Sequence, residues 1–174
     1  MFERYTFEDP RDDSHQELDR GEVITTPPPG GLPGVACLKA GRRLGNFVEE
    51  NDRGTVTSNG TGFITERGPD SVRGPDIAHW SKEKLPVVPV GYIEVPPDLL
   101  VEVLSPSNTS KQIRGKLRGY FAKGVRMVWV IAPEDRTLTI YRTPDEGRLV
   151  HESAPVTGDD VLPGFTCRVN DLLP

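Results

Sequence analysis

The chain has 174 residues, a length that suits a single domain large enough for a proper hydrophobic core. Its 18 glycines and 17 prolines predict many turns, and a hydrophobic content of 35% is modest without reaching the disordered class. The formal net charge of −5 argues against a generally basic coat for nucleic acid, and no apolar run is long enough to span a bilayer.

The negative charge is concentrated near the N-terminus. Residues 1–22 hold eight acids against three arginines, so the remainder of the chain is neutral overall. Residues 1–16 show no periodicity and are expected to form a loose acidic leader, followed by one domain over 17–174. The N-terminus does not have the pattern of a signal peptide, and the two cysteines, Cys37 and Cys167, have no metal or redox spacing. We therefore expect two reduced thiols in a cytoplasmic protein.

The first part of the domain predicts a strand and a helix. Residues 17–24 are expected to make a turn into a short strand, and the proline- and glycine-rich residues 26–31 a mobile loop. Apolar residues recur at near-helical spacing over 34–50, which predicts a helix that 51–54 ends.

Weaker strand signals follow. Thr55–Ser58 and Gly62–Thr65 are separated by Asn59-Gly60, a dipeptide typical of tight hairpin turns, so they predict a β-hairpin. Val72–Trp80 predicts the next strand. Residues 81–97 contain four prolines and predict a long connection.

Two strongly apolar strands joined by an amphipathic helix form the centre of the prediction. Asp98–Leu104 is typical of a strand buried on both faces, and residues 105–109 end it and cap a helix at about Thr109–Lys123. Val125–Ala132 is the second such strand. The βαβ order predicts that the two strands are parallel neighbours joined by a right-handed crossover.

The rest of the chain adds antiparallel strands. Thr137–Tyr141 alternates apolar and polar residues, and residues 148–152 are expected to pair with it. Residues 162–165 and 170–173 close the chain with a short helical turn. The predicted fold class is α/β, with a mixed central β-sheet of about six or seven strands flanked by helices.

The most informative single residue is Glu102, because it interrupts the apolar strand 98–104. A carboxylate in a strand interior must be protonated, paired with a cation or bound to a metal. On the following helix, Lys116 lies at the edge of the apolar face and Lys111 points the opposite way. Lys116 is therefore expected to reach toward Glu102, or to snorkel with its stem on the core edge.

A run of positive charge follows the same strand. Residues 111–126 carry six basic side chains and no acid. Beside a carboxylate site such a strip suits a phosphate backbone, but it is equally typical of an ordinary solvated helix face.

Four sequence runs together resemble one known family. They are E-L-D-R-G-E-V from Glu17, G-P-D-I-A-H-W over 74–80, P-D-L-L-V-E-V-L-S-P-S from Pro97, and K-L-R-G-Y-F-A-K-G-V-R-M-V-W-V-I-A-P from Lys116. The chain resembles the Uma family of putative restriction endonucleases over most of its length. That family is similar in fold to the PD-(D/E)XK nuclease superfamily, so the resemblance implies a restriction-endonuclease-like fold and Mg²⁺-dependent (or Mn²⁺-dependent) hydrolysis of DNA phosphodiester bonds.

The resemblance also assigns site residues. Asp76 matches the metal-binding aspartate, although an aspartate after Pro75 also suits a turn cap. Glu102 is the second metal ligand, and a third acid is expected from Glu22 or, alternatively, Glu17. Two oxygen-donor side chains with waters and a phosphate suit Mg²⁺.

One position departs from the superfamily pattern. The catalytic lysine normally stands two residues after the acid, where this chain has Leu104, so Lys116 is expected to replace it. The alternative function is a catalytically inactive nuclease-fold module that binds nucleic acid or protein. A homodimer is also expected, because small nucleases that cut both strands of a duplex commonly act as two-fold dimers. His79, Trp80 and Trp129 are expected to be structural residues.

Overall fold

The computed structural model describes residues 16–174, so the loose leader expected over 1–16 lies almost entirely outside the described residues. The main sheet has six strands and is mixed, as predicted. In spatial order its strands are β10 (Gly147–His151), β9 (Thr137–Tyr141), β8 (Met127–Ala132), β7 (Leu99–Val103), β6 (Ile77–Trp80) and β3 (Thr55–Ser58).

The two apolar strands β7 and β8 are parallel neighbours, with Leu99 opposite Met127 and Val103 opposite Ile131. The other strand pairs of this sheet are antiparallel. Helix α2 (Ser110–Lys123) connects β7 to β8. The prediction of parallel neighbouring strands joined by a helix is thus confirmed, and so is the predicted pairing of β9 with β10.

Helix α2 has clear sequence signals at both ends. The Thr109 hydroxyl accepts a hydrogen bond from the Gln112 N–H, and the Gln112 side chain accepts one from the Thr109 N–H, which is a capping box. Gly124 ends the helix in the left-handed conformation, at φ 104°. These caps fix where the helix begins relative to the end of β7.

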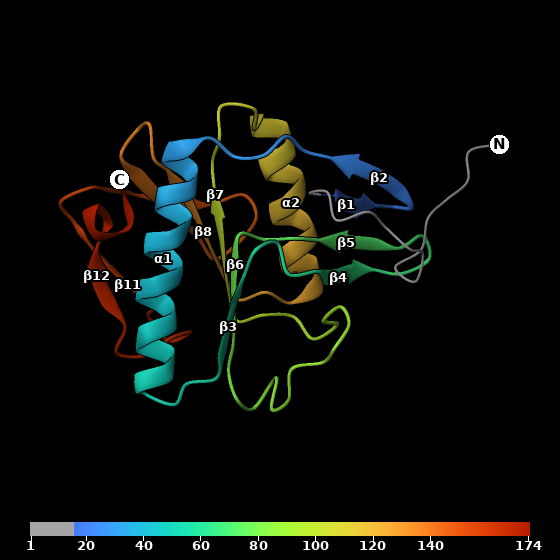
Figure 1. The fold of residues 1–174 in the computed structure, drawn as a ribbon, viewed down its shortest axis with the longest axis horizontal. Coiled ribbons are helices and arrows are strands. Elements are labelled where there is room, and N and C mark those ends of the chain that lie inside the picture. The colour runs from blue at the N-terminus through green and yellow to red at the C-terminus, as the bar shows by residue number, and fades with distance from the viewer. Residues whose placement is uncertain (1–15) are drawn as a thin grey trace.

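The two helices cover opposite faces of the main sheet (Figure 1). Helix α1 (Gly31–Glu50) begins three residues before the predicted start and buries Ala36, Ala40, Leu44 and Val48 against one face. Helix α2 buries Leu117 and Tyr120 against the other. No helix within residues 16–174 is both long and apolar enough to cross a membrane.

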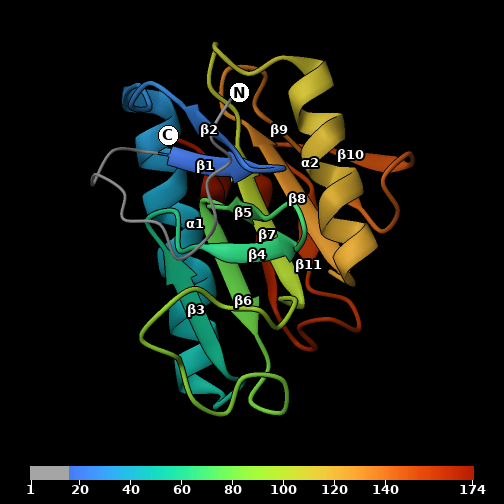
Figure 2. The same ribbon diagram turned by 90° about the vertical axis from the view of Figure 1, so that its right-hand side faces the viewer.

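A second sheet of four strands lies beside the first and runs across it (Figure 2). Its strands are, in spatial order, β2 (Glu22–Thr25), β1 (Gln16–Asp19), β5 (Ser71–Arg73) and β4 (Phe63–Glu66). The predicted turn into one strand over 17–24 is thus a complete hairpin, because Arg20 and Gly21 both take positive φ between β1 and β2.

The predicted hairpin of Thr55–Ser58 with Gly62–Thr65 is wrong. Asn59 and Gly60 do form the expected turn, with φ of 60° and 65°, and the Thr61 N–H donates to the Ser58 carbonyl. The strands on either side of this turn diverge, however, because β3 pairs with β6 in the main sheet and β4 pairs with β5 in the small one. Local turn chemistry identified the turn but not the partner strands.

The strand predicted over Val72–Trp80 is in fact two strands. Gly74, Pro75 and Asp76 interrupt it, and β5 and β6 on either side belong to different sheets. Proline cannot donate to a ladder, and a Cβ on Gly74 would lie 2.8 Å from the Gly60 carbonyl oxygen. The break therefore brings the chain close to the turn at Asn59-Gly60 and sets Asp76 at the junction of the two sheets.

The C-terminal part contains a small sheet that the sequence did not predict. Strands β11 (Pro155–Thr157) and β12 (Thr166–Arg168) pair antiparallel, and the 3₁₀ helix η1 (Val169–Leu172) follows as the expected short helical turn. Their apolar residues join the core on the α1 side. Residues 81–97 form the predicted long connection without a named helix or strand.

Candidate active site

Glu102 lies on β7 and is buried, with 7% of the residue exposed. The Tyr120 hydroxyl donates to Glu102 Oε1 over 2.5 Å, and the Lys116 ammonium lies 3.4 Å from Oε1 and 3.3 Å from Oε2. Tyr120 and Lys116 both project from α2, one helical turn apart. The predicted proximity of Lys116 to Glu102 is confirmed.

Lys116 is shared between two acids. Its ammonium donates to Glu17 Oε1 over 2.9 Å, a shorter contact than either of those to Glu102. Glu17 also accepts from the Gly74 N–H and from the Arg73 guanidinium, each over 3.2 Å. Strand β1 of the small sheet thus supplies an anchored carboxylate to the lysine on α2.

Asp76 reaches the same region from the break between β5 and β6. Its Oδ2 accepts a hydrogen bond of 2.7 Å from the Val103 N–H, next to Glu102 in sequence. The bond ties the junction of the sheets to the carboxyl end of β7. In an open α/β sheet, this end of a strand is where ligands usually bind.

A pocket of about 540 Å³ opens over these side chains and is lined by Glu17, Asp76, Glu102 and Lys116. The residues that cap α2 add polar groups, Ser105, Ser107 and Asn108, to its wall. Pro27, Pro29 and Pro33, at the entry to α1, also line the pocket. This contribution could not be predicted from the sequence, because a loop without catalytic side chains gives no signal of where it packs.

The charged groups in the pocket shift one another's pKa values. Burial raises the pKa of Glu102 above its ordinary value, and the carboxylates of Asp76 and Glu17 add to the rise, while the Lys116 ammonium opposes it. Burial alone would lower the pKa of Lys116, but Glu102 and Glu17 outweigh it and raise the pKa, so the ammonium stays charged. Burial, followed by the negative charge of Glu102, also raises the pKa of Tyr120, which therefore remains a proton donor.

The donor chemistry of the pocket suits a small divalent cation. Mg²⁺ typically binds through one or two carboxylates and completes its shell with water and phosphate oxygens, and Asp76 and Glu102 are two carboxylates in one pocket. Within residues 16–174, no group of three or more His, Cys, Asp or Glu side chains is arranged to hold a metal.

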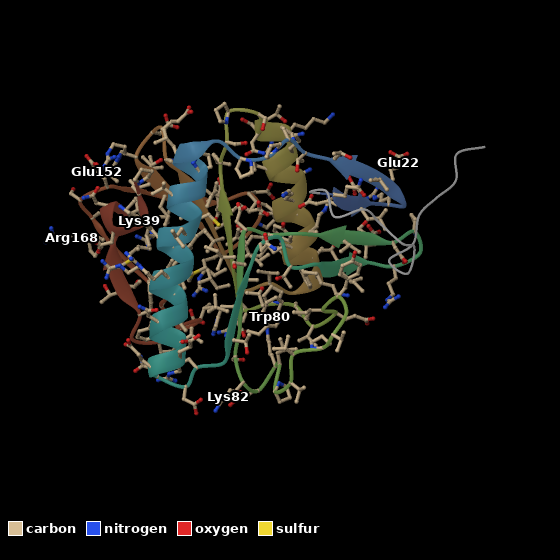
Figure 3. The ribbon with its side chains drawn as sticks, viewed as in Figure 1. Glu22, Lys39, Trp80, Lys82, Glu152 and Arg168 are labelled. Atoms are coloured by element: carbon tan, nitrogen blue, oxygen red, sulfur yellow. The ribbon has the colours of Figure 1, made fainter. Side chains whose placement is uncertain are left out.

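Glu22 is not brought to this cluster. Its side chain is exposed on β2, at the outer side of the small sheet (Figure 3). The acid beside Lys116 is Glu17, the alternative considered from the sequence. In the hairpin Glu17 pairs with Ile24 and Glu22 with Asp19, so Glu22 lies two pairs closer to the turn, and the sequence alone could not fix this pairing.

The expected structural residues are in the interior. Trp80 and Trp129 are fully buried, and His79 is 1% exposed with its Nε2 3.1 Å from the Arg53 carbonyl oxygen. Cys37 lines the pocket, and its Sγ lies 3.9 Å from the Asp76 carbonyl oxygen. Burial and the Asp76 carboxylate raise the pKa of Cys37 to about 11, so it is a neutral thiol rather than a nucleophile.

Comparison with known proteins bears on the fold and on the family. A solved structure described as a putative nuclease belonging to DUF820, from Anabaena variabilis, has 20% sequence identity and a TM-score of 0.79, covering 94% of this chain and 92% of that one. At this identity the match establishes the fold, which is restriction-endonuclease-like as predicted. None of the curated proteins compared matches the chain. The family model described as "Putative restriction endonuclease" matches residues 1–170, and the chain therefore belongs to the Uma2 family.

Proposed function

We propose that this chain is a metal-dependent endonuclease that hydrolyses DNA phosphodiester bonds. The observation that carries the proposal is the meeting of Glu102, Asp76 and Lys116 in one pocket at the carboxyl end of β7. The nuclease descriptions of the family and of the solved relative support the reaction class.

Asp76 and Glu102 are the residues that would hold Mg²⁺ or Mn²⁺. When bound, such an ion lowers the pKa of an attacking water and neutralises charge on the phosphate. Lys116 provides a fixed positive charge next to the scissile phosphate. It replaces the superfamily's catalytic lysine, whose position in this chain is occupied by Leu104. Tyr120 holds Glu102 Oε1 from the interior and so fixes the direction of the carboxylate.

The basic strip of α2 is the proposed path of the DNA backbone. Lys111 and Arg114 are exposed on the helix that also carries Lys116 into the pocket. Backbone recognition of this kind depends on Lys and Arg near phosphates and not on the net charge of the whole protein. The overall charge of −5 is therefore compatible with a DNA substrate.

Cleavage of supercoiled plasmid tests the proposal. With Mg²⁺ or Mn²⁺ the protein is expected to nick or linearise the plasmid, with EDTA it is not, and Glu102→Gln should abolish the activity because the neutral amide is a far weaker ligand for the cation. Glu134→Gln, an exposed acid in the turn before β9, is the matched control. A wild-type protein inactive with both metals, or a Glu102→Gln variant as active as wild type, would overturn the proposal.

The alternative is a module on the same fold that binds without cleaving. It is favoured by the double engagement of Lys116, whose ammonium is held by Glu17 as well as Glu102. This alternative predicts no plasmid cleavage with either metal, together with DNA or protein binding that does not require a metal. A Glu17→Gln variant separates the two cases, since release of Lys116 should change the cleavage rate of an enzyme and leave a binding module unaffected.

A further inference from the structure

The two edges of the main sheet are differently equipped. The edge strand β10 carries the charged Arg148, whereas the other edge, β3, has the sequence Thr-Val-Thr-Ser without charge or proline. Among residues 16–174, β3 pairs on one side with β6, and its other side has no strand partner. Natural sheets usually protect a free edge with charge, proline or a bulge, so a bare β-branched edge is a template for another strand.

A groove runs along this edge. It has a volume of about 410 Å³ and lies between β3 and the second half of α1. The helix contributes Gly41, Arg42, Gly45, Asn46 and Glu49 to its wall. At Gly45 an added Cβ would meet no atom within 4 Å, so the space beside the helix is open within the chain.

The two charges in the groove have opposite signs and are symmetrically placed. Arg42 and Glu49 lie on either side of the midpoint between Gly45 and Asn46, and neither forms an ion pair with the described residues. They are seven residues apart, or about 10.5 Å along a helix. The four residues of β3 span about 10 Å. The groove is lined both by residues 41–49 of α1 and by all four residues of β3. The midpoint of this helical segment therefore lies beside the midpoint of β3.

From this match we infer that β3 and the adjoining face of α1 form a two-fold interface between two copies of this chain. An antiparallel β3–β3 pair would place Thr55 opposite the second copy's Ser58, and Val56 opposite its Thr57, extending the sheet across both copies. The same dyad turns one α1 antiparallel to the other, with Arg42 facing the second copy's Glu49 and the reverse. Gly45, which borders open space, lets the two helices approach closely over the joined strands.

This inference does not rest on the proposed nuclease function. The candidate site lies at the Asn59-Gly60 end of β3. An antiparallel pairing therefore sets the two pockets at opposite ends of the joined strands, and each site is complete within its own chain. Association and cleavage can be measured separately.

Sedimentation velocity of the full chain, from micromolar to sub-millimolar concentration, tests the interface. The wild-type protein is expected to dimerise. Arg42→Glu and Glu49→Arg should each weaken the dimer by roughly tenfold or more, because each creates two like-charge contacts by symmetry, and the double variant should restore it. Arg148→Glu makes the same charge change at the other sheet edge and should have no effect.

Gly45→Leu is the second test, since a Cβ added there meets no atom of the chain itself, whereas a side chain at this position would separate the closely packed helices of a dimer. It should leave the circular dichroism spectrum unchanged and abolish the dimer. A wild-type monomer at all concentrations would overturn the inference. So would a dimer that tolerates Gly45→Leu, that is weakened as much by Arg148→Glu, or that the double charge swap fails to restore.

Discussion

Glu102 and its neighbours show how one buried carboxylate is kept in a strand. Burial and two nearby acids make its charged form costly, whereas the Lys116 ammonium and the Tyr120 hydroxyl stabilise it. Tyr120 itself is held by the core, where its ring stacks on Phe63 with centroids 6.5 Å apart. The carboxylate is thus oriented by the Tyr120 hydroxyl on one side and by the Lys116 ammonium, which Glu17 also holds, on the other.

The Tyr120→Phe variant is expected to lower the free energy of unfolding by about 1–3 kcal/mol, because Glu102 loses a short buried hydrogen bond while the ring packing is kept. Equilibrium urea unfolding measures the change. Tyr141→Phe, a half-buried tyrosine on β9, is the control and should change stability by much less. Equal losses in the two variants would show that the Tyr120 hydroxyl contributes nothing specific.

At the residue scale, the sequence identified the pair Glu102 and Lys116 because both signals are local. An acid in an apolar run and a lysine on the edge of a helix face are visible in the printed sequence. Glu17 was left as the second choice for the third acid, because its place beside Lys116 depends on a contact between residues 99 positions apart. Such a contact leaves no periodic pattern.

At the scale of elements, the ends of the central strands are held by a second buried carboxylate, Asp98. It immediately precedes β7 and accepts a hydrogen bond of 2.9 Å from the Ser81 N–H, which follows β6. Lys84 lies 3.0 Å and Arg126 3.4 Å from the same carboxylate. Burial alone would raise the pKa of Asp98, but the hydrogen bond from Ser81 and the Lys84 ammonium outweigh it and hold the pKa below its ordinary value of 3.8.

Asp98→Asn is expected to reduce the free energy of unfolding at neutral pH by about 2 kcal/mol, a value kept low because Lys84 and Arg126 are partly exposed. A depressed pKa contributes stability above the unfolded-state value, and this contribution is lost as the pH falls below 3.8 and through the folded-state pKa. The difference in the free energy of unfolding between wild type and Asp98→Asn should therefore disappear in that acidic range. Urea unfolding at a series of pH values measures it.

The exposed Asp135→Asn is the control for this titration and should give a constant, small difference. A gap for Asp98→Asn that persists unchanged below the acidic range would contradict the assigned pKa direction. It would mean that the loss comes from packing and not from the charge of Asp98.

The elements predicted correctly are those whose signals are strong and local. Strands β7 and β8 are continuous apolar runs, and α2 has a capping box and a terminal glycine. The errors fall where pairing depends on distant strands, as in β3 and β4, which share a turn but belong to different sheets. The small sheet β11–β12 was missed because strands of three residues are too short to show alternation.

At the scale of the whole molecule, charge is distributed unevenly. The exposed basic residues Lys111 and Arg114 lie on α2, the helix that also carries Lys116 into the pocket, although the chain as a whole is acidic. If this helix carries the DNA, each of the two residues contributes to counterion release when DNA binds.

Lys111→Ala and Arg114→Ala, made in an inactive Glu102→Gln background, should each reduce the salt dependence of DNA binding. The slope of log affinity against log salt is expected to fall by about 0.9 per removed phosphate contact. Fluorescence anisotropy with labelled duplex DNA measures the slope. Arg168→Ala, an exposed arginine of β12 on the α1 side of the main sheet (Figure 3), should leave the slope unchanged, and equal slopes for all three variants would exclude α2 as the DNA path.

The two carboxylates that hold Lys116, Glu102 and Glu17, close chain loops of very different length. Glu102 is 14 residues from the lysine, whereas Glu17 is 99 residues from it. The contact between Tyr120 and Glu102 is also local, at 18 residues. Closing the longer loop costs roughly 1.7 kcal/mol more in chain entropy. We therefore expect the β7–α2 part of the pocket to form early in folding and the β1–β2 hairpin to dock last. A newly made chain would then hold its central charge pair before the N-terminal acid reaches it.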